Sequence, residues 1–476
     1  MEPTQPTLNI FERFNAWIEE SITVKLFSIG FLVLILLIPS AWIVELMEER
    51  EGRAESVMQE VSEKWSNSQT VSGPILVIPY KTIEKIDRGK NGIELKERVE
   101  NYFFLPEKLD IQGVVDPKVL HRGIFDAAVY NSSLSVSADF TKPNFAALGI
   151  AAEDVLWNKA HMIFSLSDLR GISDNPVFKV GSIVKATEPS NDLGLAIEES
   201  KTITHISEYE EPVEVSTSTR TSKGIIAPLL WQSADDFKEN TSIVLQLKGS
   251  KSLRFVPTGK TTLVSLKGPW NNPSFDGEFI PEDRAVTEKD FSATWKILNY
   301  NRPFAQQWSG KNQVISGADF GVTLLIPVDQ YQKSIRTAKY GQLIIILTFV
   351  ALFLVEITKR IRIHPFQYIL IGVALIIYYS LLLSLSEQVG YNIAYSIASL
   401  ATIGLVSFYA SSFLKNAQLV ILFTSLLTMF YTFIFVIILQ QDFSLLLGSI
   451  GLFLIVAALM YFSRKVEWYK SSAAVN

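Results

Sequence analysis

Five polar side chains stand out in an otherwise apolar carboxy-terminal stretch as the residues best suited to chemistry. They are Glu356, His364, Gln367, Tyr368 and Glu387. Placing an ionisable group within a membrane is costly, so these residues indicate a functional site, such as a path for a proton or a ligand. A role in helix packing or at the membrane interface, where both acids can reach water, explains the same pattern and is the interpretation we favour.

Signatures of catalysis, metal binding and cofactor binding are missing from the sequence. Gly259-Lys260-Thr261 imitates the end of a phosphate-binding loop, but Arg254 stands where that motif needs glycine, which favours a β-turn. His121, His161 and His205 are scattered and lack metal-ligand spacing. The absence of cysteine excludes disulfides, thiol catalysis and cysteine metal sites. We therefore predict that the protein is not an enzyme and that it has no catalytic, cofactor-binding or metal site.

An aromatic-rich stretch offers one further candidate surface. Trp270-Asn271-Asn272-Pro273-Ser274-Phe275 is followed by Phe279, Phe291 and Trp295. These rings are expected either to form a ligand-binding surface or to pack in a core around irregular loops. Core packing is the favoured interpretation.

The charge content of the chain separates a membrane part from a water-soluble part. Of the 476 residues, 19% are charged, against about 25% in a typical soluble protein. The deficit is concentrated in a run near residue 26 and in a stretch from about 341 to 463. The net charge of -5 is too mild to indicate a nucleic-acid partner.

The first apolar run, Leu26–Val44, is long enough to span a bilayer, which needs about 20 residues. It is longer than the apolar core of a signal peptide and lacks a clean cleavage site, so we predict an uncleaved anchor. Leu8, Phe11, Phe14 and Ile18 precede it at helical spacing and predict an amphipathic helix. That helix is expected either at the membrane surface or packed on the protein's own bundle.

Between about 46 and 337 the hydrophobic period changes from helical to two. The segment 42–64 is charge-rich and could continue the first helix into water. Beyond it, alternating apolar residues predict strands with one buried face, as at 134–140, 162–166 and 243–247. Turns are expected at Lys90-Asn91-Gly92, Asp116-Pro117, Asp174-Asn175-Pro176, Lys248-Gly249, Lys267-Gly268-Pro269 and Asn272-Pro273. Many short strands favour an antiparallel sandwich or a barrel-like α+β body, with two packed subdomains possible.

Five more spans are predicted at about 340–358, 366–386, 393–411, 418–439 and 443–462. Within the first of them, Glu356 precedes Arg360 by four residues, the spacing of an ion pair on one helix face. With the amino terminus inside, the inner segments carry nine basic residues, whereas the short outer loops near 387–392 and 440–442 carry none. This asymmetry predicts that both termini are cytoplasmic and that the large insert lies on the far side.

These patterns divide the chain into five parts. They are an amphipathic cytoplasmic segment (1–24), a first transmembrane helix (25–45), a β-rich extracytoplasmic domain (46–337), a five-helix transmembrane bundle (338–463) and a cytoplasmic tail (464–476). The predicted fold is a membrane protein with about six transmembrane helices, one amino-terminal and five carboxy-terminal. The large inserted β-rich domain is expected to be all-β or α+β.

The order of these features resembles the CreD family of bacterial inner-membrane proteins over almost the whole chain. The matching fragments include Ser72-Gly73-Pro74, Ile78-Pro79, Leu105-Pro106-Glu107, Arg122-Gly123-Ile124-Phe125, Leu169-Arg170-Gly171-Ile172, Pro327-Val328-Asp329-Gln330-Tyr331 and Lys339-Tyr340. The most specific block runs from Leu347-Thr348-Phe349 to Glu356, then His364-Pro365, Gln367-Tyr368 and Leu385-Ser386-Glu387. The amino-terminal extension is longer than the family leads us to expect.

The resemblance implies a multi-pass protein of the bacterial inner membrane with a periplasmic domain. It also implies a part in cell-envelope integrity, control by a two-component system and a link to envelope stress and β-lactam tolerance, without an established reaction. The expected function is non-catalytic binding of an envelope component, or of a membrane or periplasmic protein, by the β-rich domain, with the lipid bilayer as the other partner. The alternative is a transporter, or a lipid-handling or signal-relay protein, that uses the polar residues of the bundle.

Overall fold

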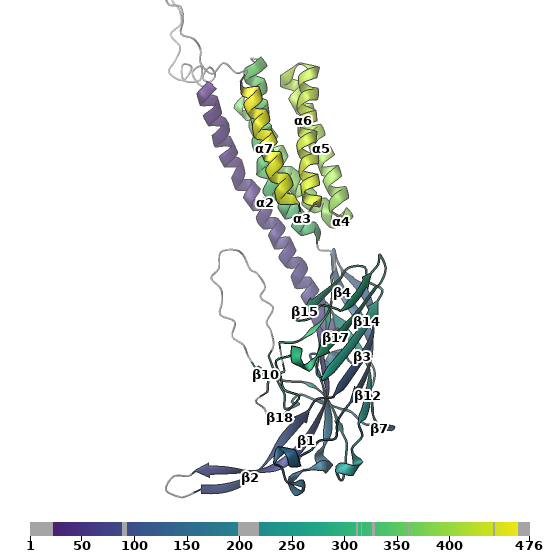
Figure 1. The fold of residues 1–476 in the computed structure, drawn as a ribbon. Coiled ribbons are helices and arrows are strands. Elements are labelled where there is room, and N and C mark those ends of the chain that lie inside the picture. Colours follow the sequence, from purple (N-terminus) through teal and green to yellow (C-terminus); the bar gives the residue numbers. More distant parts are fainter. Residues whose placement is uncertain are drawn as a thin grey trace, which may run out of the picture. The chain divides into compact units, whose positions relative to one another are not determined.

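The computed structural model describes residues 22–87, 93–198, 219–310, 313–315, 317–325, 329–359, 361–440 and 443–464. The chain forms two compact units, a membrane unit (Met1–Ala54 and Pro327–Asn476) and a β unit (Glu55–Ile326). Figure 1 shows helices in the former and mainly strands in the latter. The predicted amphipathic helix at 8–18, the turn at Lys90-Asn91-Gly92 and His205 lie outside the described residues.

Six helices account for the apolar stretches. They are α2 (Ile22–Trp65), α3 (Asp329–Lys359), α4 (Pro365–Val389), α5 (Tyr391–Leu414), α6 (Ala417–Leu439) and α7 (Ser444–Ser463). Among the described residues, the first five are long and apolar enough to cross a membrane, and α7 adds a shorter apolar stretch, Leu446–Ala458. The sequence predicted one amino-terminal and five carboxy-terminal spans, and the described residues contain one amino-terminal helix and four to five apolar carboxy-terminal helices, which confirms the predicted class of fold. The expected continuation of the first span is also confirmed, because α2 runs unbroken to Trp65.

Close packing among α2, α3 and α4 depends on two glycines. A Cβ atom on Gly341 of α3 would lie 2.4 Å from the ring of Tyr379 in α4, and one on Gly372 of α4 would lie 2.3 Å from Leu36 in α2. Small residues of this kind let membrane helices approach closely. On α2, the buried residues Ile29, Leu36 and Met47 lie on the same face. Their spacings of 7 and 11 residues correspond to about two and three helical turns.

The β unit contains two large sheets and a small one. The first sheet, with nine strands, has the order β15-β19-β13-β1-β5-β11-β8, with β2 and β18 attached beside β1; the second, with eight, has the order β16-β17-β14-β3-β4-β12-β6-β7. Their strands are mostly antiparallel, but β1 pairs with β13, and β3 with β14, in parallel. The bounds are β1 (Gln69–Asp87), β2 (Ile93–Phe104), β3 (Lys108–Arg122), β4 (Phe125–Asp139), β5 (His161–Leu166), β6 (Val177–Val180), β7 (Ile183–Lys185), β8 (Glu188–Ser190), β9 (Ala196–Glu198), β10 (Thr219–Thr221), β11 (Gly224–Pro228), β12 (Asn240–Ser250), β13 (Ser252–Val256), β14 (Thr261–Gly268), β15 (Pro273–Gly277), β16 (Asp283–Val286), β17 (Phe291–Leu298), β18 (Gln307–Ser309) and β19 (Phe320–Leu324).

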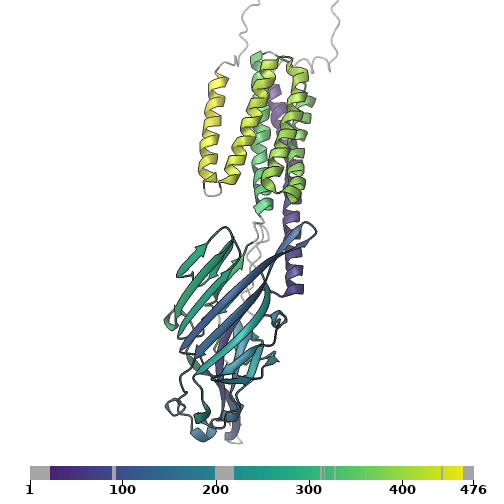
Figure 2. The same ribbon diagram turned by 90° about the vertical axis from the view of Figure 1, so that its right-hand side faces the viewer.

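One hydrophobic core lies between the two large sheets, and Figure 2 shows the sheets from the side. The predicted inward-facing residues of 134–138, 162–166 and 243–247 all belong to this core. Strand β5 departs from the simple alternation because Ile163 and Ser165 on its other face are buried as well. A second cluster around Ile75, Phe103 and Ile163 covers that face of the first sheet. Phe291 and Trp295 are core residues, with Trp270, Phe275 and Phe279 packed against the same core, so the core-packing interpretation of the aromatic stretch is confirmed.

Two predicted turns are wrong, because both lie inside strands. Asp116-Pro117 belongs to β3, at a point past Val114 where the pairing with β14 has ended. Proline is tolerated at such an edge because its missing N–H costs no ladder bond there. Lys248-Gly249 belongs to β12, where a Cβ atom on Gly249 would lie 2.3 Å from the Tyr130 hydroxyl. Glycine marks a close approach at this position, and no chain reversal occurs.

The end of α2 is held to the β unit by a set of contacts that we call the helix clamp, made by Gln69, Asp168 and Arg170. Gln69 is fully buried, and its Nε2 donates to the Asp168 carbonyl at 2.9 Å and to the Lys248 carbonyl at 3.2 Å. Arg170 donates to the carbonyl of Glu63 in the last turns of α2 at 2.9 Å and to the Asp168 carboxylate at 2.7 Å. Cations at a helix carboxy terminus stabilise the unpaired carbonyls there.

The charge of the helix clamp is kept over a wide pH range. The Arg170 guanidinium holds the pKa of Asp168 well below its usual range, at about 2. Because this pKa is depressed in the folded state, the stability it contributes is present above about pH 4 and is lost only as the pH falls towards 2.

Gly171→Ala tests the helix clamp. A Cβ atom there would lie 2.2 Å from Gln69 Nε2 and 2.4 Å from the Lys248 carbonyl oxygen. We expect the β unit to lose about 1–3 kcal/mol of unfolding free energy through overpacking, measured by denaturant unfolding of the purified full-length chain. Gly52→Ala is the control, because its Cβ meets nothing within 4 Å and alanine favours a helix interior by up to about 1 kcal/mol. Equal stabilities for the Gly171 variant and the wild type would contradict the assignment.

Candidate functional site

The predicted polar residues of the bundle fall into two groups at opposite ends of helices α3 and α4. Tyr368 near the start of α4 contacts Glu356 near the end of α3, whereas Glu387 near the end of α4 contacts Tyr331 near the start of α3. The two helices are therefore antiparallel. Along α3, Glu356 and Tyr331 are about 37 Å apart at 1.5 Å per residue, so the two acids form separate sites.

Glu356 is the centre of the first group. Lys25 of α2 donates to Glu356 Oε1 at 2.6 Å, and the Tyr368 hydroxyl donates to Oε2 at 3.0 Å. The backbone N–H of Ile363 also donates to Oε1 at 3.3 Å. Both carboxylate oxygens are thus occupied, and the residue is only 4% exposed. The expectation that Glu356 reaches water is wrong, because helix α2 and the α3–α4 connection cover it.

The ion-pair partner of Glu356 comes from a distant part of the sequence. The pair that the structure contains is with Lys25, 331 residues away, and Arg360 lies outside the described residues. A buried carboxylate needs a charged or hydrogen-bonding partner because removing it from water is costly. The pair therefore joins the amino-terminal helix to the carboxy-terminal bundle.

His364 and Gln367 form the amino-terminal cap of α4. The Phe366 N–H donates to His364 Nδ1 at 3.2 Å, and the His364 N–H donates to Gln367 Oε1 at 2.9 Å. Pro365 occupies the first helical turn, where its missing N–H costs nothing. This reciprocal capping positions Tyr368 one turn into the helix, under Glu356. His364 itself is exposed.

The second group surrounds Glu387, which is half-buried. The Tyr331 hydroxyl donates to its Oε1 at 3.2 Å. In the same part of the bundle, Thr337 of α3 and Tyr391 of α5 share a buried hydrogen bond of 2.6 Å between their hydroxyls. The residues of this group tie the beginning of α3 to the end of α4 and the start of α5.

A cluster of buried tyrosines in the bundle was not predicted from the sequence. The Tyr378 ring lies 4.8 Å from Tyr379 and 4.8 Å from Tyr431, and the Tyr395 hydroxyl donates to the Tyr431 carbonyl at 2.7 Å. Its one sequence signal is the i, i+4 spacing of Tyr391 and Tyr395 in α5. Leu375, Phe349 and Leu352, all buried and apolar, occupy α3 and α4 between this cluster and Glu356.

In the β unit, the residues considered from the sequence have structural partners. His121 pairs with Asp126 at 2.6 Å, His161 Nδ1 lies 2.9 Å from the Lys159 carbonyl, and Lys260 pairs with Glu107 at 3.0 Å. Gly259 and Lys260 form a bend directly before strand β14, where the Gly259 N–H donates to Thr262 Oγ1 at 3.0 Å, so the segment leads into a strand and not into the helix that a phosphate-binding loop needs. Within the described residues, no group of three or more His, Cys, Asp or Glu side chains could hold a metal ion.

Lys25→Met tests the role of the Glu356 pair. It leaves a buried carboxylate without its cation, so we expect the unfolding free energy to fall by about 3–5 kcal/mol, measured by denaturant titration in micelles. The double change Lys25→Met with Glu356→Gln is expected to recover part of that loss, because no unpaired charge is left. Arg53→Met is the control, since it removes an exposed pair with Glu49 worth less than about 1 kcal/mol. If Lys25→Met and Arg53→Met lower the unfolding free energy by the same amount, the Lys25–Glu356 pair does not anchor α2.

Comparison with known proteins agrees with this architecture. The family model described as inner membrane protein CreD matches residues 21–469. A relative, inner membrane protein CreD of Escherichia coli (strain K12), is 30% identical over 452 residues, which are 94% of this chain and 94% of the relative. Because the match extends over both the β unit and all six helices, the chain belongs to the CreD family of inner membrane proteins.

Proposed function

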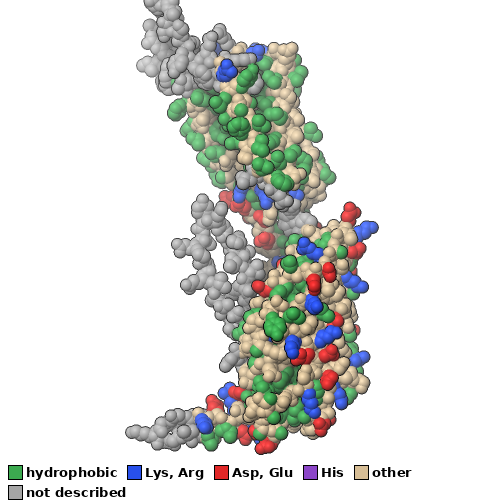
Figure 3. Space-filling model, viewed as in Figure 1, with side chains coloured by type: hydrophobic (Ala, Val, Ile, Leu, Met, Phe, Trp, Pro, Cys, Tyr) green, Lys and Arg blue, Asp and Glu red, His purple; other side chains and the backbone are tan. Residues whose placement is uncertain are grey.

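We propose that this inner-membrane protein is non-catalytic and acts in cell-envelope integrity, with the β unit binding an envelope component or a protein partner on the periplasmic side. The main support is an exposed two-stranded extension of the first sheet. We call it the β-arm, made of residues 81–87 of β1 and 93–100 of β2. Figure 3 shows it projecting from the body of the β unit, with charged and hydrophobic side chains mixed along it.

The β-arm has open edges. Its strands pair with each other from Lys81–Val99 to Asp87–Ile93. Among the described strands, β5 pairs with β1 only up to Val77, and β18 pairs with β2 only from Tyr102 onward. The unpaired backbone groups along such edges can bind another extended chain.

One face of the β-arm also carries three exposed apolar side chains, which alternate there with the charged residues Lys81, Lys85 and Glu97. Ile83 is 63% exposed, Leu95 62% and Val99 48%. Ile83 faces Glu97 across the ladder, so Leu95 and Val99 are its diagonal neighbours on the same face. The Lys81–Glu97 ion pair at 2.7 Å lies beside them. A two-stranded ribbon is marginally stable alone, and an apolar stripe on it favours a binding partner that covers it.

The residues of the bundle give less support to the transport alternative. A path across the membrane would have to join Glu356 to Glu387, and apolar core residues lie between the Glu356 group and the tyrosine cluster. The contacts of Glu356 favour an anchoring role, and its part in transport stays a prediction.

Replacing the apolar stripe tests the proposal. We expect Ile83→Ser with Leu95→Ser to lower partner capture by about tenfold or more, because each buried aliphatic side chain contributes about 1.5 kcal/mol or more. The measurement is quantitative crosslinking and pull-down of the full-length chain from intact cells. Ile280→Ser is the matched control, since Ile280 is 77% exposed elsewhere on the β unit. Undiminished partner capture by a folded double variant would exclude the β-arm as the binding surface.

The proposed orientation has its own test, which uses the absence of cysteine from the chain. Lys415, which connects α5 to α6, belongs to the basic set expected inside. A membrane-impermeant maleimide is expected to label Ile280→Cys in intact spheroplasts and Lys415→Cys only after lysis. Labelling of Lys415→Cys in intact spheroplasts would reverse the proposed topology.

A further inference from the structure

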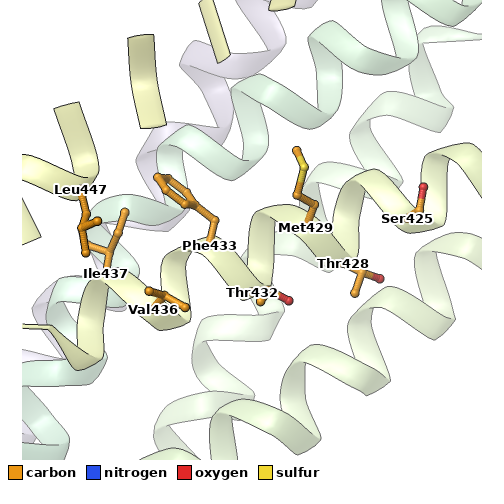
Figure 4. Close-up of a pocket in the computed structure, with 8 residues that line it drawn as sticks. All are labelled: Ser425, Thr428, Met429, Thr432, Phe433, Val436, Ile437 and Leu447. Carbon is orange, nitrogen blue, oxygen red and sulfur yellow. The ribbon is translucent and has the colours of Figure 1, made fainter. Parts of the chain in front are cut away.

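Helices α6 and α7 leave a groove between them on the outer surface of the bundle. It has a volume of about 520 Å³ and is lined by Ser425, Thr428, Thr432, Phe433 and Ile437 of α6 and by Leu447 of α7, with two further α6 side chains. Figure 4 shows these side chains following one face of α6. The lining is almost entirely from α6, so α7 covers only one end of the groove.

That end is closed by a tight contact. A Cβ atom on Gly451 of α7 would lie 1.9 Å from the Phe433 ring, so glycine is needed for α7 to approach α6 there. From this contact the two helices separate towards the start of α6 and the end of α7, as Figures 1 and 2 both show. The lining of the groove runs from this contact along α6 to Ser425, and we call it the wedge.

The walls of the groove are suited to hydrocarbon. The Ser425 hydroxyl donates to the Leu422 carbonyl at 2.9 Å, and the Thr428 hydroxyl donates to the Thr424 carbonyl at 2.9 Å. Both hydroxyls donate within their own helix, so neither needs a hydrogen bond from a polar ligand. Helix α6 is apolar enough to cross a membrane, and the groove therefore opens onto acyl chains.

The length of the groove suits an extended acyl chain. Ser425 to Ile437 spans about 18 Å along α6. This apolar groove has room for a stretch of one acyl chain laid along α6.

Two cations lie beyond the Ser425 end of the wedge. Lys415, in the left-handed conformation at φ 49, caps α5 just before α6 begins, and Arg464 directly follows α7. Both are exposed. Because α6 and α7 are antiparallel, the start of one and the end of the other reach the same membrane surface. Basic residues at that level attract anionic headgroups.

We propose that the α6–α7 groove is a binding site for a phospholipid with a net negative headgroup. The distal part of one acyl chain fills the wedge between Ser425 and Leu447. Lys415 and Arg464 bind the phosphate end of the same lipid. The lipid chain thereby packs along α6 beside α7.

The probe for this site is a phosphatidylglycerol with a photoactivatable group in the distal half of one chain. It is added to nanodiscs of phosphatidylcholine that contain the full-length chain, and the crosslinked residues are mapped by mass spectrometry. We expect crosslinks on α6 between Ser425 and Ile437. Crosslinking is expected to fall about tenfold at low salt when Lys415→Gln and Arg464→Gln are combined.

Thr432→Trp is expected to fill the groove and abolish these crosslinks. Leu400→Trp is the matched control, since Leu400 is 73% exposed on α5 outside the groove. Thermal unfolding verifies that each variant is folded. Equal crosslinking of Thr432→Trp and wild type would contradict the groove as the binding site. Crosslinks between two copies at α6, or equal crosslinking of a phosphatidylcholine probe, would contradict an anionic phospholipid as the ligand.

Discussion

The arrangement of the membrane unit depends on the buried ion pair between Lys25 and Glu356. The β unit is inserted between α2 and α3, so these two helices must be brought together by contacts that the chain connection does not provide. A carboxylate that is 4% exposed is costly to bury without its partners. The pair therefore requires α2 to lie against the end of α3, and Leu36 against Gly372 sets the same register further along.

The other end of α2 is held just as specifically, by the helix clamp of Gln69, Asp168 and Arg170. Each end of this single helix is thus fixed to a different unit by polar contacts, and its exposed middle carries Glu48, Glu49 and Arg53.

Much of this architecture could be predicted because it follows from hydrophobic periodicity. Spans of about 20 apolar residues and the alternation at 134–138 are local signals, and both are present in the structure. The partner of Glu356 could not be predicted, because an i+4 neighbour is visible in a sequence and a residue 331 positions away is not. The turns expected at Pro117 and Gly249 failed for the same reason, since strand edges and the Tyr130 contact are tertiary features.

The bundle has two unlike sides, and the difference bears on where its lipid site lies. Towards α2, α3 and α4, polar side chains such as Glu356, Tyr368 and Glu387 hold helices together from within. Towards α7, the described contacts are apolar and centre on Gly451 with Phe433. In a membrane, apolar contact between helices competes with equally apolar lipid. An acyl chain ordered in the proposed site beside α6 would add apolar contact of the same kind on this side of the bundle.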